Sequence, residues 1–163
     1  MKISFKNGPK NCFLAGLSFP PITVARTAII ILNYRHLEDT LRLVQSLEQS
    51  TDQDFDIYVV DNCSDNLSLP EITAALPQSH ILRTGENLGY AGGNNAALRL
   101  IETLDYEFVW VLNPDTEVEP ETLEEHVVAA ITHPDHSIFG PAIQNGATLG
   151  RVTSAGMFCD LSD

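Results

Sequence analysis

The sequence is poor in basic side chains and in cysteine. Of its 163 residues only 9 are lysine or arginine, against 22 acidic residues, which gives a formal net charge of −13. Proteins that bind nucleic acid usually present a basic face to the phosphate backbone, so no nucleic-acid partner is expected. The 3 cysteines, Cys12, Cys63 and Cys159, are odd in number and widely spaced. That pattern argues against a disulfide framework or a zinc site, and it favours a reducing, cytoplasmic location.

Long apolar runs and the common phosphate-binding motifs are also missing. No stretch approaches the roughly 20 apolar residues of a membrane-spanning helix. The overall hydrophobic content of 44% still suffices for the core of one domain. The glycine-rich residues 87–95 have neither the Gly-x-Gly-x-x-Gly spacing of dinucleotide-binding proteins nor the Lys-Ser or Lys-Thr of a P-loop. They also follow the third predicted strand and not the first, so a nicotinamide-dependent dehydrogenase is disfavoured.

Residues 1–25 are expected to lie outside the core as a flexible or loosely docked extension. Three lysines precede a short, interrupted apolar patch at residues 12–19, which Pro20 and Pro21 close. A cleaved secretory signal has a similar outline and is the less favoured alternative. The two prolines mark a natural boundary, so residues 26–163 are predicted to form the domain.

Over the rest of the chain, apolar β-branched runs alternate with stretches of helical spacing. Strands are predicted over residues 27–33, 55–61, 80–82 and 108–112, with two further extended segments at 137–140 and 151–159. Helices are predicted over residues 37–49, 69–76 and 94–104, and from residue 119 onward. Ser68 and Glu71 have the spacing of a capping box, which predicts the start of the second of these helices. This alternation is typical of an α/β fold with a mostly parallel sheet and helices on both faces. Residues 108–112 show no polar alternation, which predicts a central strand buried on both faces.

Polar side chains follow each of the first four predicted strands. They are Asn33, Asp61, Asn62, Arg83, Asn113 and Asp115. The carboxyl ends of parallel strands share one edge of a sheet, where α/β folds bind ligands, so these residues are expected to converge there. Pro114 has no N–H for a strand ladder and holds Asp115 just past the strand, where a carboxylate suits a hard cation carrying phosphates. Each residue alone has a plainer explanation: Asp115 as a helix cap, Asp61 as a loop cap, Arg83 as a solvated charge.

Four ordered motifs make the chain resemble the family 2 glycosyltransferases, and most closely their rhamnosyltransferase-like branch. The motifs occupy residues 30–34, 59–64, 86–95 and 112–115. The resemblance covers about residues 27–160 and implies a GT-A fold, a Rossmann-like nucleotide-sugar binding domain. It also implies inverting transfer of a rhamnose-like sugar from a dTDP- or UDP-linked donor to a saccharide acceptor, in polysaccharide biosynthesis.

The resemblance further implies which residues form the site. The nucleotide-sugar pocket would draw on all four motifs, through Leu32, Asn33, Tyr34, Asp61, Arg83, Asn87, Gly92, Asn94 and Asn113. Asp61 would accept a hydrogen bond from the base, since an acceptor-only group can discriminate between base edges. The family's Asp-x-Asp motif corresponds to Asn113-Pro114-Asp115, with an amide in place of the first acid. Asp115 alone would therefore bind a Mg²⁺ or Mn²⁺ ion that neutralises the leaving diphosphate.

The catalytic base of this family is a carboxylate in the second half of the domain, and no acidic residue here matches its motif. The expectation is therefore the donor-binding half of a longer enzyme, with no catalytic residue assigned. Acceptor binding, and peripheral membrane association, would belong to a further C-terminal part. The alternative is a truncated, non-catalytic module that binds a nucleotide-sugar. A sugar-phosphate nucleotidyltransferase is disfavoured, because residues 33–36 lack the glycines that would grip a triphosphate.

Overall fold

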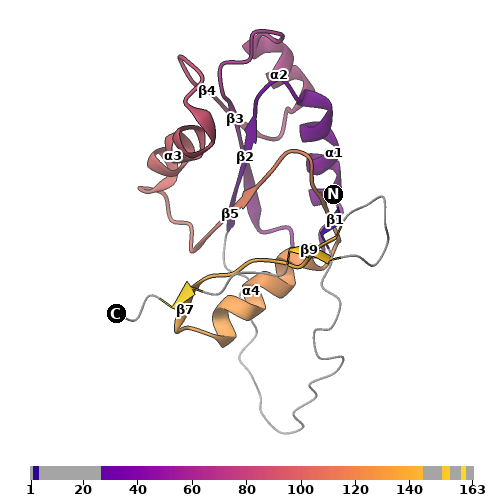
Figure 1. Cartoon of the computed structure of the whole chain (residues 1–163), viewed down its shortest axis with the longest axis vertical. Helices are drawn as coiled ribbons and strands as arrows, with labels where there is room; N and C mark the ends of the chain where they lie inside the picture. Colours follow the sequence, from indigo (N-terminus) through magenta and orange to yellow (C-terminus); the bar gives the residue numbers. More distant parts are fainter. Residues whose placement is uncertain (1, 4–26, 145–151, 155–158, 161–163) are drawn as a thin grey trace, which may run out of the picture.

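The central feature of the fold is a parallel sheet of four strands. The computed structural model describes residues 2–3, 27–144, 152–154 and 159–160. The strand order is β4-β3-β2-β5 and every pairing is parallel (Figure 1). The bounds are β2 Thr27–Asn33, β3 Phe55–Asp61, β4 His80–Arg83 and β5 Phe108–Leu112. The predicted α/β class, with four parallel strands at these positions, is therefore confirmed.

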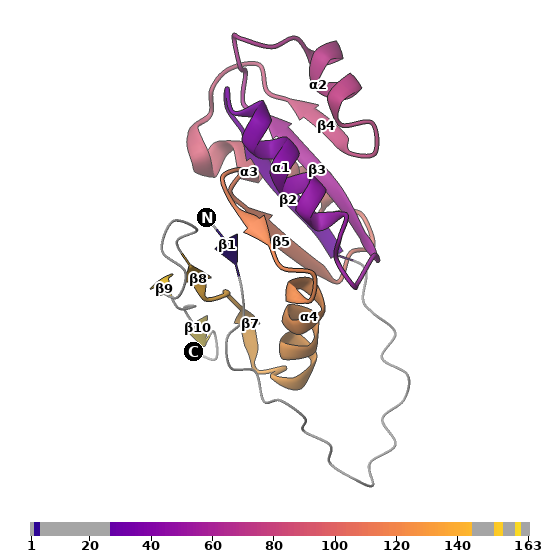
Figure 2. The ribbon, with the colours of Figure 1, turned by 90° about the vertical axis from the view of Figure 1, so that its right-hand side faces the viewer.

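Helices cover both faces of this sheet, as Figure 1 and Figure 2 show from two sides. The covering helices are α1 Leu37–Leu47, α2 Leu69–Ala75 and α3 Gly89–Ile101. A fourth helix, α4 Thr122–Thr132, lies at the lower end of the sheet in both views. Side chains of α1 and α2 join the core on one face, and side chains of α3 join the core on the other. Within the described part, none of these helices has the length and apolar character needed to cross a bilayer.

Shorter strands lie beside the main sheet. A second sheet has the order β6-β1-β8-β9, and β7 pairs with β10. The bounds are β1 Lys2–Ile3, β6 Glu117–Val118, β7 His136–Ile138, β8 Ile143–Gln144, β9 Val152–Ser154 and β10 Cys159–Asp160. Two residues of the expected N-terminal extension thus form β1. Residues 4–26 lie outside the described residues, and the extension stays a prediction.

The core is built on β2, whose side chains alternate between the two faces. Ile29 and Ile31 pack with α1 and α2, whereas Ala28 and Ile30 pack with α3. All four of these side chains are fully buried. Burying one isoleucine contributes about 1.5–3 kcal/mol, so Ile29, Ile30 and Ile31 together make this strand a large apolar contributor to stability. The rule that strands of parallel sheets read as continuous apolar runs holds for β2.

Local sequence signals account for the start of α2. Ser68 caps the helix, and its hydroxyl oxygen accepts a hydrogen bond from the Glu71 backbone N–H at 3.4 Å. The Glu71 carboxylate in turn accepts the Ser68 N–H at 2.7 Å. This reciprocal pair is the predicted capping box, and it satisfies two backbone donors that a helix start would otherwise leave open.

The position of β5 differs from the prediction. Among the described residues β5 pairs with β2 alone, so it is an edge strand, and Val109 and Val111 are 45% and 39% exposed. The helix on that face, α3, packs on β2 and β3. The prediction of burial on both faces was wrong because an apolar run shows only that a strand can be buried. Which neighbours cover it depends on tertiary structure.

The glycine-rich segment also differs from the prediction. Helix α3 begins at Gly89 and ends at Ile101, whereas residues 94–104 were predicted as helix. Gly92 and Gly93 therefore lie inside the helix, whereas Leu104, the last residue of the predicted helix, lies beyond its end and is 47% exposed. Glycine usually signals a turn, but here it permits close packing. A Cβ atom on Gly93 would lie 2.3 Å from Cδ1 of Leu32.

Replacement of Gly93 by alanine is expected to destabilise the domain by about 1 kcal/mol. Alanine favours a helix interior by about 1 kcal/mol over glycine. The overlap with Leu32 should outweigh this gain, because crowding a packed site costs about 1–3 kcal/mol. Urea unfolding measures the difference. Gly85→Ala is the matched control, since a Cβ there meets nothing within 4 Å. Equal stability of the two variants would contradict the close approach of α3 to β2.

His126 is a half-buried imidazole of α4 that packs against β5. Its ring centroid lies 5.1 Å from that of Trp110, and Nδ1 donates a hydrogen bond to the Thr122 carbonyl at 2.7 Å. Burial lowers the pKa of His126 below its ordinary value, and the bond to Thr122 opposes this only in part. The neutral ring is therefore the form that the folded chain prefers.

This preference predicts a loss of stability in mild acid. The pKa of His126 is lower in the folded chain than the about 6.5 of an unfolded one. The neutral His126 ring therefore contributes fully to the free energy of unfolding above about pH 6.5, and this contribution is lost as the pH falls below that value. Thermal unfolding from pH 7.5 to 5 should show a smaller decline for His126→Phe than for the unsubstituted chain. The exposed His36→Phe should retain the full decline, and parallel curves for all three proteins would contradict the prediction.

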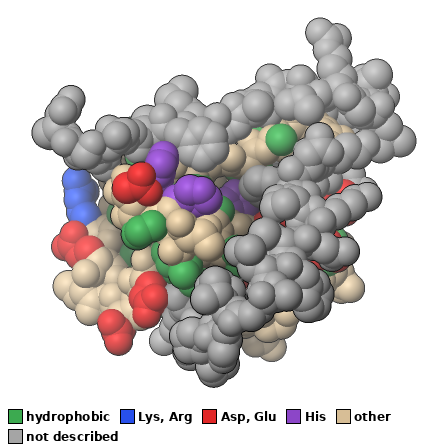
Figure 3. Space-filling view, turned by 90° about the horizontal axis from the view of Figure 1, so that it is seen from below, with side chains coloured by type: hydrophobic (Ala, Val, Ile, Leu, Met, Phe, Trp, Pro, Cys, Tyr) green, Lys and Arg blue, Asp and Glu red, His purple; other side chains and the backbone are tan. Residues whose placement is uncertain are grey.

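The turn between α4 and β7 brings two more histidines together. The rings of His133 and His136 meet edge to face at 5.9 Å, and His136 Nδ1 lies 3.1 Å from an oxygen of Asp135. Figure 3 shows histidine, acidic and hydrophobic side chains side by side on the lower face of the molecule. The neighbouring histidines lower the pKa of Asp135, mainly through the contact with His136. This face is remote from the carboxyl edge of the main sheet.

Candidate functional site

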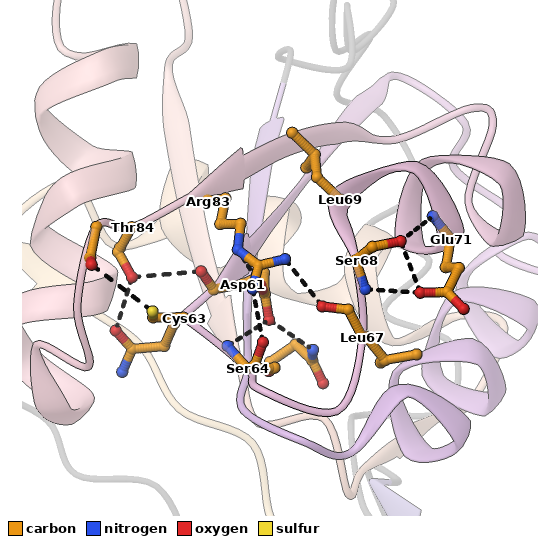
Figure 4. Close-up of polar contacts among 12 residues, drawn as sticks. Asp61, Cys63, Ser64, Leu67, Ser68, Leu69, Glu71, Arg83 and Thr84 are labelled. Atoms are coloured by element: carbon orange, nitrogen blue, oxygen red, sulfur yellow. Dashed lines mark hydrogen bonds and ion pairs between the residues drawn. The ribbon is translucent and has the colours of Figure 1, made fainter.

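The polar residues at three strand ends lie in one row. Across the sheet Asn33 is the register partner of Asp61, and Asp61 is the partner of Arg83. These residues are far apart in the sequence and come together because β2, β3 and β4 are parallel and end at the same edge. The predicted convergence is therefore present, and Figure 4 shows its centre.

Asp61 is the buried centre of this row. Its side chain is fully inaccessible to solvent. The oxygen Oδ1 accepts hydrogen bonds from Asn33 Nδ2 at 3.3 Å and from the Ser64 backbone N–H at 3.4 Å. The other oxygen, Oδ2, has no hydrogen-bond partner among the described residues but lies 3.4 Å from Nε of Arg83 in an ion pair. A buried carboxylate with one underused oxygen is a costly arrangement, which suggests a functional reason.

Arg83 stabilises the loop that follows β3 through hydrogen bonds to its backbone. Its guanidinium donates to the Leu67 carbonyl at 2.9 Å and to the Ser64 carbonyl at 2.6 Å, besides facing Asp61 (Figure 4). The side chain is 27% exposed. A solvated edge charge, the plainer explanation, therefore does not describe it. Arg83 also lines an open cavity of about 560 Å³ with residues of the loop and of α2, namely Asp65, Asn66, Leu67, Ser68, Leu69 and Glu71.

Two residues with left-handed backbone conformations flank Asp61. Arg35 has φ 66° and Cys63 has φ 60°, and neither is glycine. The loops that carry them are joined by a hydrogen bond of 2.9 Å from the Arg35 N–H to the Ser64 hydroxyl. Such conformations cost about 1–3 kcal/mol each and are retained where the surroundings enforce them, often at functional sites. The strained backbone of these two loops is thus a second indication, besides the buried side chains, that this edge of the sheet is the functional one.

The start of α3 brings further predicted site residues to the same edge. Leu32, near the end of β2, lies under Gly93, and Gly92 comes close to Leu88 of the preceding turn. Asn94 is 6% exposed, and its amide nitrogen donates to the Tyr90 carbonyl at 3.0 Å. Its amide oxygen has no partner within the described ranges. The segment therefore places one more buried acceptor beside the strand ends.

Asn113 and Asp115 follow β5, next to the row. Leu112 is the register partner of Ile31, so the chain after β5 leaves the sheet beside the end of β2. Both side chains are exposed. The Asn113 carbonyl accepts hydrogen bonds from the Thr116 hydroxyl at 2.7 Å and from its N–H at 3.2 Å, which closes a turn. The alternative that Asp115 caps the next helix is not supported, because α4 begins only at Thr122.

Asn62 is a residue of this edge whose role the sequence does not predict. Asn62 is 2% exposed, and its side chain joins the end of β3 to the turn that leads into α3. The only sequence signal was its place directly after Asp61, and that position does not reveal the distant turn that it contacts.

Comparison with known proteins identifies the family. The chain matches the family model of glycosyl transferase family 2 over residues 28–155. A relative, the low-salt glycan biosynthesis hexosyltransferase Agl10 of Haloferax volcanii, is 34% identical over 120 residues, which are 72% of this chain and 36% of that protein. The crystal structure of S. aureus TarS 1-349 is similar with a TM-score of 0.57 and 23% identity, over 68% of this chain and 34% of that one.

Crystal structures of the same TarS fragment in complex with UDP and with UDP-GlcNAc give the same similarity. The chain spans about a third of the length of these relatives. The likeness to TarS is one of fold, and it agrees with the GT-A architecture expected from the motifs. Because the family model covers most of the sequence, the chain belongs to glycosyl transferase family 2.

Proposed function

We propose that this chain is the donor-binding part of an inverting glycosyltransferase that uses a nucleoside diphosphate sugar in glycan biosynthesis. The observation that carries the proposal is the row of Asn33, Asp61 and Arg83 at the carboxyl edge of the sheet, beside the strand end that bears Asp115. The names of the relatives support it, since Agl10 is called a hexosyltransferase and TarS was crystallised with UDP and UDP-GlcNAc. The proposed donor is UDP- or dTDP-linked, with a rhamnose-like sugar, and the acceptor is a saccharide.

Asp61 is proposed to recognise the base. Its Oδ2 atom has no hydrogen bond within the described residues and would accept an imide N–H of uracil or thymine. Because the carboxylate is buried, the base reaches it only if Arg83 or the loop of residues 64–67 moves outward. Leu32 and Tyr34 would line the same pocket, and Asn87 and Asn113 would contact the phosphate and sugar side.

Asp115 is proposed to bind a divalent cation. Its carboxylate is exposed just past the end of β5, and the described residues contain no group of three or more acidic, histidine or cysteine side chains that could hold a metal. This donor set fits Mg²⁺ or Mn²⁺, because such ions are often bound by one or two carboxylates together with substrate phosphates and water. When bound, the ion would stabilise the charge of the leaving diphosphate. The protein itself supplies the oxygen ligand and the polar strand ends around it.

Calorimetric titration of the purified chain with UDP and dTDP, with and without Mn²⁺, tests the proposal. We expect binding of at least one of the two, strengthened by Mn²⁺, and weaker binding of ADP, whose base does not offer the imide donor. Absence of heat at millimolar concentrations of both pyrimidine nucleotides would refute it.

A binding module without activity is the second candidate, favoured by the lack of any acidic residue that matches the catalytic base of the family. It predicts the same titration results but no sugar transfer and no hydrolysis of UDP-sugars. Release of UDP from a UDP-sugar by the purified chain, followed over hours, would rule it out.

A further inference from the structure

The side chain of Asn62 makes four hydrogen bonds within the turn that precedes α3. Its oxygen accepts the Leu88 backbone N–H at 2.9 Å and the Thr84 hydroxyl at 3.3 Å. Its nitrogen donates to Asn87 Oδ1 at 2.8 Å and to the Gly89 carbonyl at 3.2 Å. Both N–H donors of the amide are thus used, and its oxygen accepts the Leu88 N–H fully but shares the single Thr84 hydroxyl proton with the nearer Glu86 carbonyl at 2.8 Å. The residue is 2% exposed.

These contacts fix which way both amides face. A backbone N–H can only donate, so the Leu88 N–H identifies the atom that it meets as the oxygen of Asn62. In the same way the Gly89 N–H, 2.9 Å away, identifies the inward atom of Asn87 as its oxygen. The nitrogen of Asn62 therefore faces the oxygen of Asn87. The NH₂ group of Asn87 makes no hydrogen bond among the described residues, and the residue is exposed.

We propose that Asn62 is a positioning residue, which holds the amide of Asn87 so that its NH₂ group is presented outward as a donor to the phosphate oxygens of the nucleotide. This inference rests on the proposed function. An amide can offer either a donor or an acceptor, and phosphate oxygens only accept. Residues 84–95 contain no lysine or arginine. The guanidinium of Arg83, which directly precedes them, is directed at Asp61 and two loop carbonyls. A neutral donor of fixed orientation therefore suits the anion here.

Asn87→Asp tests the orientation with the inward contacts preserved. One carboxylate oxygen still accepts from Asn62 and from the Gly89 N–H, while the outward NH₂ group becomes an oxygen. Affinity for UDP should fall more than about tenfold, the size of a lost hydrogen bond to a charged group. Affinity for uridine should change less than about twofold. Gln78→Glu, which adds the same charge in the exposed loop before β4, should leave both affinities unchanged.

Asn62→Asp tests the positioning role itself. The carboxylate still accepts from Leu88 and Thr84, but it repels Asn87 Oδ1 and attracts the NH₂ group inward. UDP affinity should fall about tenfold in the unsubstituted background and less than about twofold when Asn87 is already alanine. A role limited to keeping the turn folded would give equal losses in both backgrounds. NMR of the free protein should show slower exchange of the Asn87 side-chain NH₂ protons in Asn62→Asp.

The outcomes separate the two levels of the proposal. Equal losses in both backgrounds, or Asn87 NH₂ protons that do not respond to Asn62→Asp, would overturn the positioning role. A loss of uridine affinity as large as the loss of UDP affinity in Asn87→Asp would overturn the phosphate contact. Failure of the unsubstituted chain to bind UDP or dTDP would instead overturn the proposed function and the phosphate contact with it, while the NMR result would still decide whether Asn62 orients Asn87.

Discussion

Replacing Arg83 by methionine is expected to destabilise the domain by about 3 kcal/mol, the lower end of the cost of removing one partner of a buried ion pair. The substitution leaves the Asp61 carboxylate fully buried with no positive charge beside it. The two remaining hydrogen bonds to Asp61, from Asn33 and Ser64, are 3.3 and 3.4 Å long and compensate only in part. Urea unfolding at pH 7 measures the loss.

A double variant isolates the contribution of the charge. Arg83→Met combined with Asp61→Asn removes the buried carboxylate together with its partner, so it should be clearly more stable than Arg83→Met alone. It should still be less stable than the unsubstituted chain, because the Ser64 and Leu67 carbonyls lose donors worth about 1 kcal/mol each. A double variant as unstable as Arg83→Met would show that Arg83 acts through the loop carbonyls and not through Asp61.

Replacing Asp115 by asparagine is expected to abolish the Mn²⁺-dependent part of UDP binding. Disturbing residues around metal ligands already costs about 10–100-fold in metal affinity. Loss of the only carboxylate proposed as a ligand should exceed that range. Binding of UDP without metal should change little, because the phosphates and the base contact other residues in the proposal. Titration of Mn²⁺ by electron paramagnetic resonance at a fixed UDP concentration measures the free and bound ion directly.

The control for this result is a second exposed carboxylate, at the other end of the same strand. Asp105 precedes β5 and is exposed, as Asp115 is. Asp105→Asn removes the same charge from the chain and should leave Mn²⁺ binding unchanged. If both variants lower Mn²⁺ affinity equally, the ion responds to the overall acidity of the chain and Asp115 is not its ligand.

The parts of the fold that the sequence predicted well depend on contacts between near neighbours in the chain. The strand Phe55–Asp61 and the capping box at Ser68 were predicted with their observed residues, because β-branched runs and caps act within a few positions. The edge position of β5 and the early start of α3 were not predictable in this way. They depend on what packs against Val109 and Gly93, which the local pattern does not contain.

The candidate site also has a part that the sequence predicts and a part that depends on tertiary contacts. Parallel strands force Asn33, Asp61 and Arg83 to one edge, so topology alone predicted that they would meet. Topology did not predict that Arg83 is directed at the loop carbonyls, or that Asn62 contacts a turn more than 20 residues away in the chain. Those contacts depend on loop conformations that include the left-handed backbone of Cys63, an unusual geometry for a residue other than glycine.

The register of the sheet has a consequence for misfolding. Asn33, Asp61 and Arg83 are direct partners in the ladder, and side chains alternate between faces along each strand. A slip of β3 by a single position would place Val60 or Asn62 opposite Asn33 and turn the carboxylate toward the opposite face. Molecules with shifted strands would thus retain secondary structure but lose the proposed recognition of the base. If the chain binds nucleotides as proposed, that binding is a quality test for refolded or redesigned versions of this domain, which circular dichroism alone would not provide.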